Sequence, residues 1–266
     1  MALCPWPGRP CGGVFQGWGI VAPPSAGRRS RGSRKEATIV LILGEGSPVV
    51  LVFLPGFMTA GAAYRDLLAP VAAAGVECRV PQLYPRGPAA LLGRHRVQDE
   101  AEAAAGIAAG LSGTGRPVWL AGHSRGGQAS WRAAGLTAVQ GLVLVDPVDG
   151  GGPGSAPTTT QRPPGFDLRP LIIGAGLGGR CAPQGLNHHA FAAAAPEAMH
   201  AVVADCGHGD MLGGRWRTFA RVGCGGGSDP GAAREAISHL IRCWVTAPGD
   251  LPVDLPAGVQ AVPRPE

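Results

Sequence analysis

The stretch RPVWLAGHSRGGQASWRAAG, from Arg116 to Gly135, changes abruptly from a short apolar run to a run of helical composition. Such a change is typical of a buried strand followed by a helix. At the junction, Gly122 to Gly126 read Gly-His-Ser-Arg-Gly, a pattern in which a tight strand-to-helix turn presents a serine hydroxyl to solvent. Glycines are needed there because larger side chains would collide where the chain reverses. We therefore predict that Ser124 is a nucleophile; the alternative is a serine that only caps the helix.

Short apolar or β-branched runs alternate with helical stretches along the rest of the chain. Several runs are apolar without alternation, which is typical of parallel strands covered by helices on both faces. We expect strands at 38–43, 49–54, 77–81, 117–121, 142–145, 171–174 and 201–204, and helices at 64–74, 97–111, 127–134, 190–197 and 232–246. This order predicts an α/β fold with a mostly parallel central sheet and helices on both faces. The short GEGSP connection between the first two strands predicts an antiparallel N-terminal edge.

A serine nucleophile needs a base to accept its proton and a carboxylate to orient that base. Asp146 directly follows the apolar run 142–145, at the strand end where α/β sheets carry functional groups. Asp149, three residues further on, is the reserve candidate. His208 lies on a glycine-flanked loop after the strand at 201–204, and we predict that it is the base.

Two backbone N–H groups are expected to stabilise the oxyanion that forms when a carbonyl is attacked. One belongs to Arg125, at the start of the helix that follows Ser124, where the helix dipole favours negative charge. The second is expected from Phe57, in the loop after the strand at 49–54.

Glycine and proline cluster outside the expected strands and helices and divide the chain into three parts. Residues 1–36 are expected to be a disordered leader or an organelle transit peptide, 37–247 the catalytic domain, and 248–266 a proline-rich tail. The net charge of +5 arises from the leader, because residues 1–35 contain six basic residues and no acid, which leaves 17 bases and 18 acids in the remainder. A nearly neutral body argues against nucleic-acid binding. No apolar segment is long enough to span a membrane.

Seven cysteines without a Cys-x-x-Cys pair favour a reducing compartment, although one disulfide is compatible with them. His188 and His189, together with Cys181, imitate a metal-binding set. Their irregular spacing argues against a metal site, because histidines in the core or on the surface are far commoner. We therefore expect no metal.

Four segments resemble the chlorophyllase family of plants and green algae. They are FLPGF at 53–57 with PQLYP at 81–85, GHSRGG at 122–127, DPVDG at 146–150 and DCGHGDML at 205–212; GAGLGG at 174–179 and LNHHAF at 186–191 follow in family order. The resemblance spans residues 48 to about 245. Pro55 stands where the family commonly has histidine, and the loops that would cover the pocket are shorter than in the family.

The resemblance implies an α/β-hydrolase fold and hydrolysis of the phytyl ester of chlorophyll to chlorophyllide and phytol without a cofactor. It places the family's nucleophile, acid and base on Ser124, Asp146 and His208. It also implies a hydrophobic substrate pocket, for which the candidates are Phe57, Met58, Leu83, Tyr84, Phe191 and Met211. Alternatives are a general carboxylesterase or lipase-like hydrolase of smaller esters and a non-catalytic protein that binds a hydrophobic ligand. The expected location is the chloroplast, with the cytosol as the alternative, and peripheral membrane contact is compatible with the sequence.

Overall fold

The structure is a computed structural model that describes residues 38–83, 96–150, 167–249, 251–252 and 254–264. Ala37–Glu266 form one compact unit. The expected leader and Tyr84 lie outside the described residues. Among the residues described, no helix is both long and apolar enough to cross a membrane.

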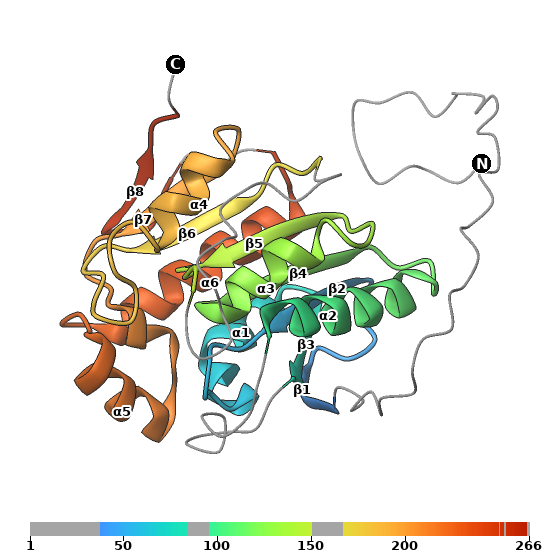
Figure 1. Ribbon diagram of the computed structural model, residues 1–266, viewed down its shortest axis with the longest axis horizontal. Coiled ribbons are helices and arrows are strands. Elements are labelled where there is room, and N and C mark those ends of the chain that lie inside the picture. Colours follow the sequence, from blue (N-terminus) through green and yellow to red (C-terminus); the bar gives the residue numbers. More distant parts are fainter. Residues whose placement is uncertain (1–37, 84–95, 151–166, 250, 253, 265–266) are drawn as a thin grey trace. The chain divides into compact units, whose positions relative to one another are not determined.

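An eight-stranded sheet forms the centre of this unit (Figure 1). Its strands are β1 (Thr38–Leu43), β2 (Val49–Leu54), β3 (Val76–Gln82), β4 (Val118–His123), β5 (Gly141–Val145), β6 (Leu171–Ala175), β7 (Met199–Val203) and β8 (Val259–Val262). Their order is β1-β3-β2-β4-β5-β6-β7-β8. All neighbouring pairs in the run β3-β2-β4-β5-β6-β7 are parallel. This confirms the predicted mostly parallel sheet.

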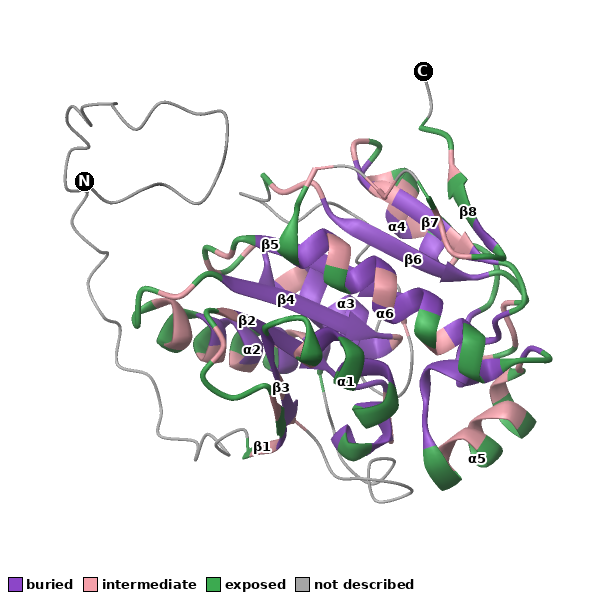
Figure 2. Cartoon of the chain, turned by 180° about the vertical axis from the view of Figure 1, so that it is seen from behind, coloured by how far each residue is buried: buried purple, intermediate pink, exposed green. Residues whose placement is uncertain are grey.

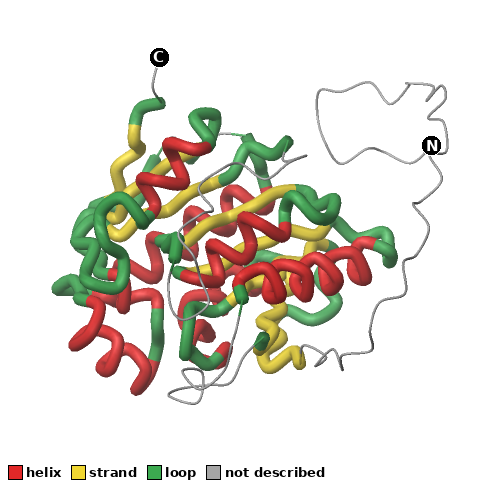
Figure 3. Tube along the Cα trace, viewed as in Figure 1, coloured by secondary structure: helices red, strands yellow, loops and turns green. Residues whose placement is uncertain are grey.

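Helices cover both faces of the sheet, as predicted (Figure 3). They are α1 (Arg65–Ala73), α2 (Val97–Ser112), α3 (Arg125–Ala133), α4 (His188–Ala194), α5 (Gly214–Cys224) and α6 (Pro230–Thr246). Residues of α1 and α6 belong to one apolar cluster, and residues of α2, α3 and α4 belong to a second. The sequence of β2 lacks alternation because both of its faces are covered: Leu51 and Phe53 belong to the first cluster, and Val50, Val52 and Leu54 belong to the second. Buried segments are purple in Figure 2.

The N-terminal edge is antiparallel, as predicted, but β1 pairs with β3 and not with β2. The turn after β1 accounts for this pairing. Gly46 N donates a hydrogen bond to Glu77 Oε2 at 2.8 Å, and a Cβ on Gly44 would lie 2.8 Å from Val76 O. The turn thus packs against the start of β3, which brings β1 alongside the outer edge of that strand.

The expected proline-rich tail contributes a strand to the sheet. β8 pairs antiparallel with β7 from His200↔Val262 to Val203↔Val259. Val259 also packs in the first apolar cluster. The sheet therefore extends beyond the domain end expected at residue 247. The helix α5 was also not anticipated, because glycines at both ends give its sequence the appearance of a loop.

Candidate active site

Ser124 lies on the turn between β4 and α3, as the sequence predicts. Its backbone adopts φ 55° and ψ −126°, a conformation uncommon for any residue except glycine. A Cβ on Gly122 would lie 2.3 Å from Gly126 O, and a Cβ on Gly126 would lie 2.1 Å from Leu54 O. Both positions therefore exclude a side chain, and the glycines allow the turn to pack against the end of β2.

Asp146 follows β5 directly and is fully buried. Two backbone groups fix its position: Asp146 N donates to Ile173 O at 2.6 Å, and Ala175 N donates to Asp146 Oδ1 at 3.1 Å. The other carboxylate oxygen, Oδ2, lies 2.6 Å from His208 Nδ1. Asp149, the reserve candidate, instead accepts a hydrogen bond from Gln128 Nε2 at 2.6 Å.

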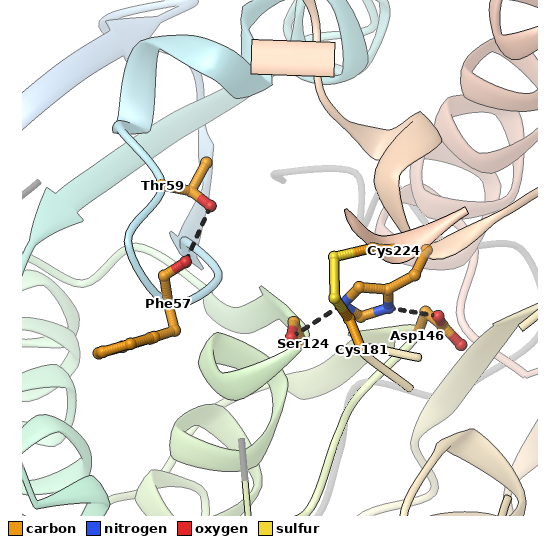
Figure 4. Close-up of a disulfide and its surroundings, with 7 residues drawn as sticks. Phe57, Thr59, Ser124, Asp146, Cys181 and Cys224 are labelled. Carbon is orange, nitrogen blue, oxygen red and sulfur yellow. Dashed lines mark hydrogen bonds and ion pairs between the residues drawn. A yellow bond between two sulfur atoms is a disulfide. The ribbon is translucent and has the colours of Figure 1, made fainter. Parts of the chain in front are cut away.

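His208 opens a 3-10 turn, His208–Met211, and its imidazole joins Ser124 to Asp146. The two contacts are the dashed lines at Ser124 and Asp146 in Figure 4. Its Nε2 lies 3.0 Å from Ser124 Oγ. Asp210, which the sequence analysis did not single out, holds this turn: Gly207 N and Gly227 N donate to its Oδ2 at 2.8 and 2.6 Å. Asp210 follows Gly207 by three residues, which is the spacing of a capping box. That spacing is a signal in the sequence that could have identified Asp210.

Charge determines the direction of these hydrogen bonds. Burial raises the pKa of Asp146, but the hydrogen bond and charge of His208 outweigh burial and leave that pKa below its usual value. An ionised carboxylate can only accept hydrogen bonds. Nδ1 of His208 must therefore carry the proton and donate it to Asp146, which leaves Nε2 free to accept the Ser124 hydroxyl proton.

His123 lies beside this group without joining it. Its Nδ1 accepts a hydrogen bond from Tyr64 Oη at 2.8 Å, and Gly56 N donates to the same phenol oxygen at 2.8 Å. Burial, reinforced by the charge of His208, lowers the pKa of His123 to about 3. Within the described residues its Nε2 is buried without a hydrogen-bond partner. His123 is thus a neutral structural group.

The loop after β2 lies against Ser124. A Cβ on Gly56 would lie 3.3 Å from Ser124 Cβ, so the backbone just before Phe57 lies close to Ser124. The guanidinium of Arg125 lies 5.2 Å from the centre of the Phe57 ring, so the two expected oxyanion residues are neighbours. Thr59 Oγ1 donates to Phe57 O at 3.3 Å (Figure 4).

The side chain of Arg125 is fully buried, although its residue type and its place beside Ser124 suggest exposure. Arg125 Nη2 lies 2.6 Å from Glu100 Oε1 of α2. This ion pair joins α3, which begins directly after Ser124, to α2 on the same face of the sheet.

The candidate pocket residues lie in different environments. Met58 is half-buried in the loop beside Ser124 and has φ 63°. Leu83 is half-buried and packs against the second apolar cluster. Phe191 and Met211 are fully buried, in the second and first clusters respectively, so they are core residues and do not line an open pocket. Tyr84 lies outside the described residues.

A disulfide joins Cys181 to Cys224 (Figure 4). The cysteine content of the sequence is compatible with one disulfide but does not predict this pairing. The two chain segments that it joins also contact the His208 turn. Gly178 O accepts a hydrogen bond from His208 N at 3.2 Å, and Gly225 O accepts one from Gly209 N at 3.3 Å. The other described cysteines, Cys78, Cys206 and Cys243, are free.

Behind Asp146, the rings of His188 and His200 are joined by a hydrogen bond between Nδ1 and Nε2 at 2.8 Å. Burial lowers the pKa of each to about 4. A cavity of about 580 Å³ lies beside them, lined by the segment after β6, by α4 and by β8, and its lining contains none of the three residues Ser124, Asp146 and His208.

The model of the chlorophyllase family matches residues 27–223. The chain belongs to the chlorophyllase family. It is similar to Chlorophyllase-2 of Arabidopsis thaliana, with 31% identity over 70% of this chain and 67% of the relative, and to Chlorophyllase-1, chloroplastic, of Citrus sinensis, with 32% identity over 67% and 60%. This chlorophyllase-family protein is by class a carboxylic ester hydrolase.

Among solved structures, this chlorophyllase-family chain resembles a ferulic acid esterase from Streptomyces cinnamoneus. The TM-score is 0.56 at 15% identity, covering 82% of this chain and 75% of the esterase. At that identity the likeness concerns the fold, and it confirms the predicted α/β-hydrolase architecture.

Proposed function

We propose that this protein hydrolyses the phytyl ester of chlorophyll to chlorophyllide and phytol through a Ser124-His208-Asp146 triad. The observation that supports the mechanism is the continuous chain of contacts, 3.0 Å from Ser124 Oγ to His208 Nε2 and 2.6 Å from His208 Nδ1 to Asp146 Oδ2. Both distances are those of hydrogen bonds, and the order of the groups is that of a serine hydrolase. Family membership supports the choice of substrate.

The first half of the reaction transfers the acyl group to the enzyme. Ser124 Oγ attacks the ester carbonyl carbon while His208 Nε2 accepts its proton, and Asp146 stabilises the imidazolium. The N–H groups of Phe57 and Arg125 stabilise the oxyanion. The C–O bond to phytol then breaks, and His208 gives the proton to the departing alkoxide. This leaves the chlorophyllide acyl group on Ser124.

The second half hydrolyses that acyl-enzyme. A water molecule gives a proton to His208 as its oxygen attacks the acyl carbon. Collapse of the intermediate returns the proton to Ser124 Oγ and releases chlorophyllide as the carboxylic acid, which then loses its remaining proton to water. All proton transfers on the enzyme use side chains that the fold holds in place, so the reaction requires no cofactor.

The surface of α5 supports peripheral contact with a membrane, where a phytylated substrate resides. Phe219 and Val222 are 74% and 81% exposed. The same helix carries three arginines and no acid. Exposed apolar and basic side chains on one helix favour association with an anionic lipid surface. The named location of the Citrus sinensis relative supports a chloroplast location for this protein, with the cytosol as the alternative.

The test compares wild type with Ser124→Ala on chlorophyll and on a p-nitrophenyl short-chain ester. We expect chlorophyllide release by wild type and a loss of the order of 10⁶-fold in kcat in the variant, because the acyl-enzyme cannot form. Ser112→Ala, at the end of α2, is the matched control and should keep full activity.

Two other outcomes are possible, and each would indicate a different function. Hydrolysis of the short ester alone would keep the triad and identify a general carboxylesterase. Inactivity of folded wild type on both substrates would favour a binding protein for a hydrophobic ligand.

A further inference from the structure

Three histidines from two different elements meet outside the candidate active site. His188 and His189 open α4, and His200 lies in β7. One nitrogen from each ring can be chosen so that all three lie within 4.8 Å of one another. His188 Nδ1 and His200 Nε2 face each other across a hydrogen bond of 2.8 Å, so an ion bound by both nitrogens would replace that bond and widen their separation.

The fold holds the two inner rings firmly. His188 and His200 are 2% and 6% exposed. The ring of His188 lies over Gly174 of β6, where an added Cβ would come within 2.3 Å of it. His200 is fixed by the pairing of β7 with Ile172 of β6. Any ion at this point would therefore meet two ligands whose positions are set by the sheet.

The third ring is free to adjust. His189 is exposed, and the Asn187 side chain anchors only its backbone, accepting a hydrogen bond from His189 N at 3.2 Å. The centres of the His188 and His189 rings lie 4.1 Å apart. In a tetrahedral zinc site with Zn–N bonds of about 2.0 Å, ligand nitrogens lie about 3.3 Å apart. A rotation of the exposed His189 side chain can bring its nitrogen to that separation.

We propose that His188, His189 and His200 form a binding site for a divalent transition-metal ion, with Zn²⁺ as the expected occupant. Three imidazoles without a carboxylate suit Zn²⁺, Ni²⁺ or Cu²⁺ and not Mg²⁺ or Ca²⁺. The cavity of about 580 Å³ is lined by His188 and His189, so water can reach the fourth coordination position. Cys181, which the sequence suggested as a third ligand, is unavailable because it forms the disulfide.

Binding requires one proton to move. In the metal-free pair, either His188 Nδ1 or His200 Nε2 carries the proton of their shared hydrogen bond. When the metal takes both lone pairs, that proton moves to the other nitrogen of the same ring, and both imidazoles remain neutral.

The test adds ZnCl₂ to protein stripped of metal with a chelator, and measures binding by calorimetry and stability by thermal unfolding. We expect one Zn²⁺ per chain and a rise in the thermal midpoint, because the ion binds only the folded state. His189→Ala should weaken binding at least tenfold and abolish that rise. Since His189 is exposed, the variant should unfold at the wild-type temperature without metal.

A matched control addresses the second histidine group that could bind zinc. His239 Nε2 lies 3.5 Å from Cys243 Sγ on α6, and His239→Ala should leave zinc binding unchanged. Absence of binding to wild type, equal binding by His189→Ala, or loss of binding in His239→Ala would each overturn the proposal. These readouts are independent of ester hydrolysis.

Discussion

At the scale of single residues, the candidate site contains two buried aspartates three positions apart with different partners. Asp146 contacts His208, whereas Asp149 accepts from Gln128. We predict that Asp146→Asn lowers kcat by about 10⁴-fold, because an amide favours the wrong tautomer of His208. Steady-state kinetics on the short-chain ester measures this change.

Asp149→Asn is the matched control for that prediction. It should weaken a structural hydrogen bond and lower the thermal midpoint while leaving kcat within about tenfold of wild type. A larger loss of kcat in Asp149→Asn than in Asp146→Asn would assign the acid to the other residue.

The sequence alone predicted that Ser124, Asp146 and His208 would lie together, because each follows a strand and parallel strands bring their ends to one edge of the sheet. It could not reveal Tyr64, which supports the Gly56 backbone, or Glu100, which neutralises buried Arg125. Tyr64 ends a 3-10 turn and Glu100 lies in α2, and neither lies in a pattern that sets it apart from an ordinary helical residue.

At the scale of elements, α6 has a well-defined beginning. Asp229 Oδ1 accepts hydrogen bonds from Gly231 N and Ala232 N, both at 2.9 Å, and Pro230 occupies the first turn. We predict that Asp229→Ala lowers the free energy of unfolding by about 1 kcal/mol without changing kcat. Urea unfolding measures the loss.

Asp229→Asn retains a side-chain oxygen and should recover most of that stability. Equal destabilisation by both substitutions would mean that the charge of Asp229, and not the cap, matters.

The strongly apolar elements were predictable from sequence, and the polar or glycine-rich ones were not. β1 and β2 have the predicted bounds, since β-branched and apolar runs bounded by charged residues, glycine or proline leave few other assignments. In α5 none of the residues, all of which the structure describes, is buried, and only Trp216 and Ala220 pack partly against the first apolar cluster, so its apolar pattern is weak. β8 is only four residues long and is surrounded by prolines, which conceal its pairing with β7.

At the scale of the whole molecule, stability should depend on pH through His123. Burial lowers its folded pKa to about 3, whereas an unfolded histidine titrates near 6.5. Between these values the unfolded chain binds a proton that the folded chain does not. The contribution of His123 to the free energy of unfolding is therefore fully present above about pH 6.5 and is lost progressively as the pH falls towards 3.

We predict that the urea midpoint falls between pH 7.5 and pH 4.5, and that it falls less in His123→Asn. Asparagine keeps an acceptor for the Tyr64 hydroxyl but does not titrate. An identical fall in both proteins would assign the acid sensitivity to other groups.

The disulfide between Cys181 and Cys224 closes a covalent loop with a sequence separation of 43, and this loop contains both His208 and the exposed helix α5. Arg215, on that exposed helix, offers a protease a site for cutting the backbone. After such a cut the two pieces would stay linked and would migrate as one band on a gel without reductant. Two bands would appear only when thiol is added, so an apparently intact preparation must be examined under reducing conditions before its backbone is taken to be whole.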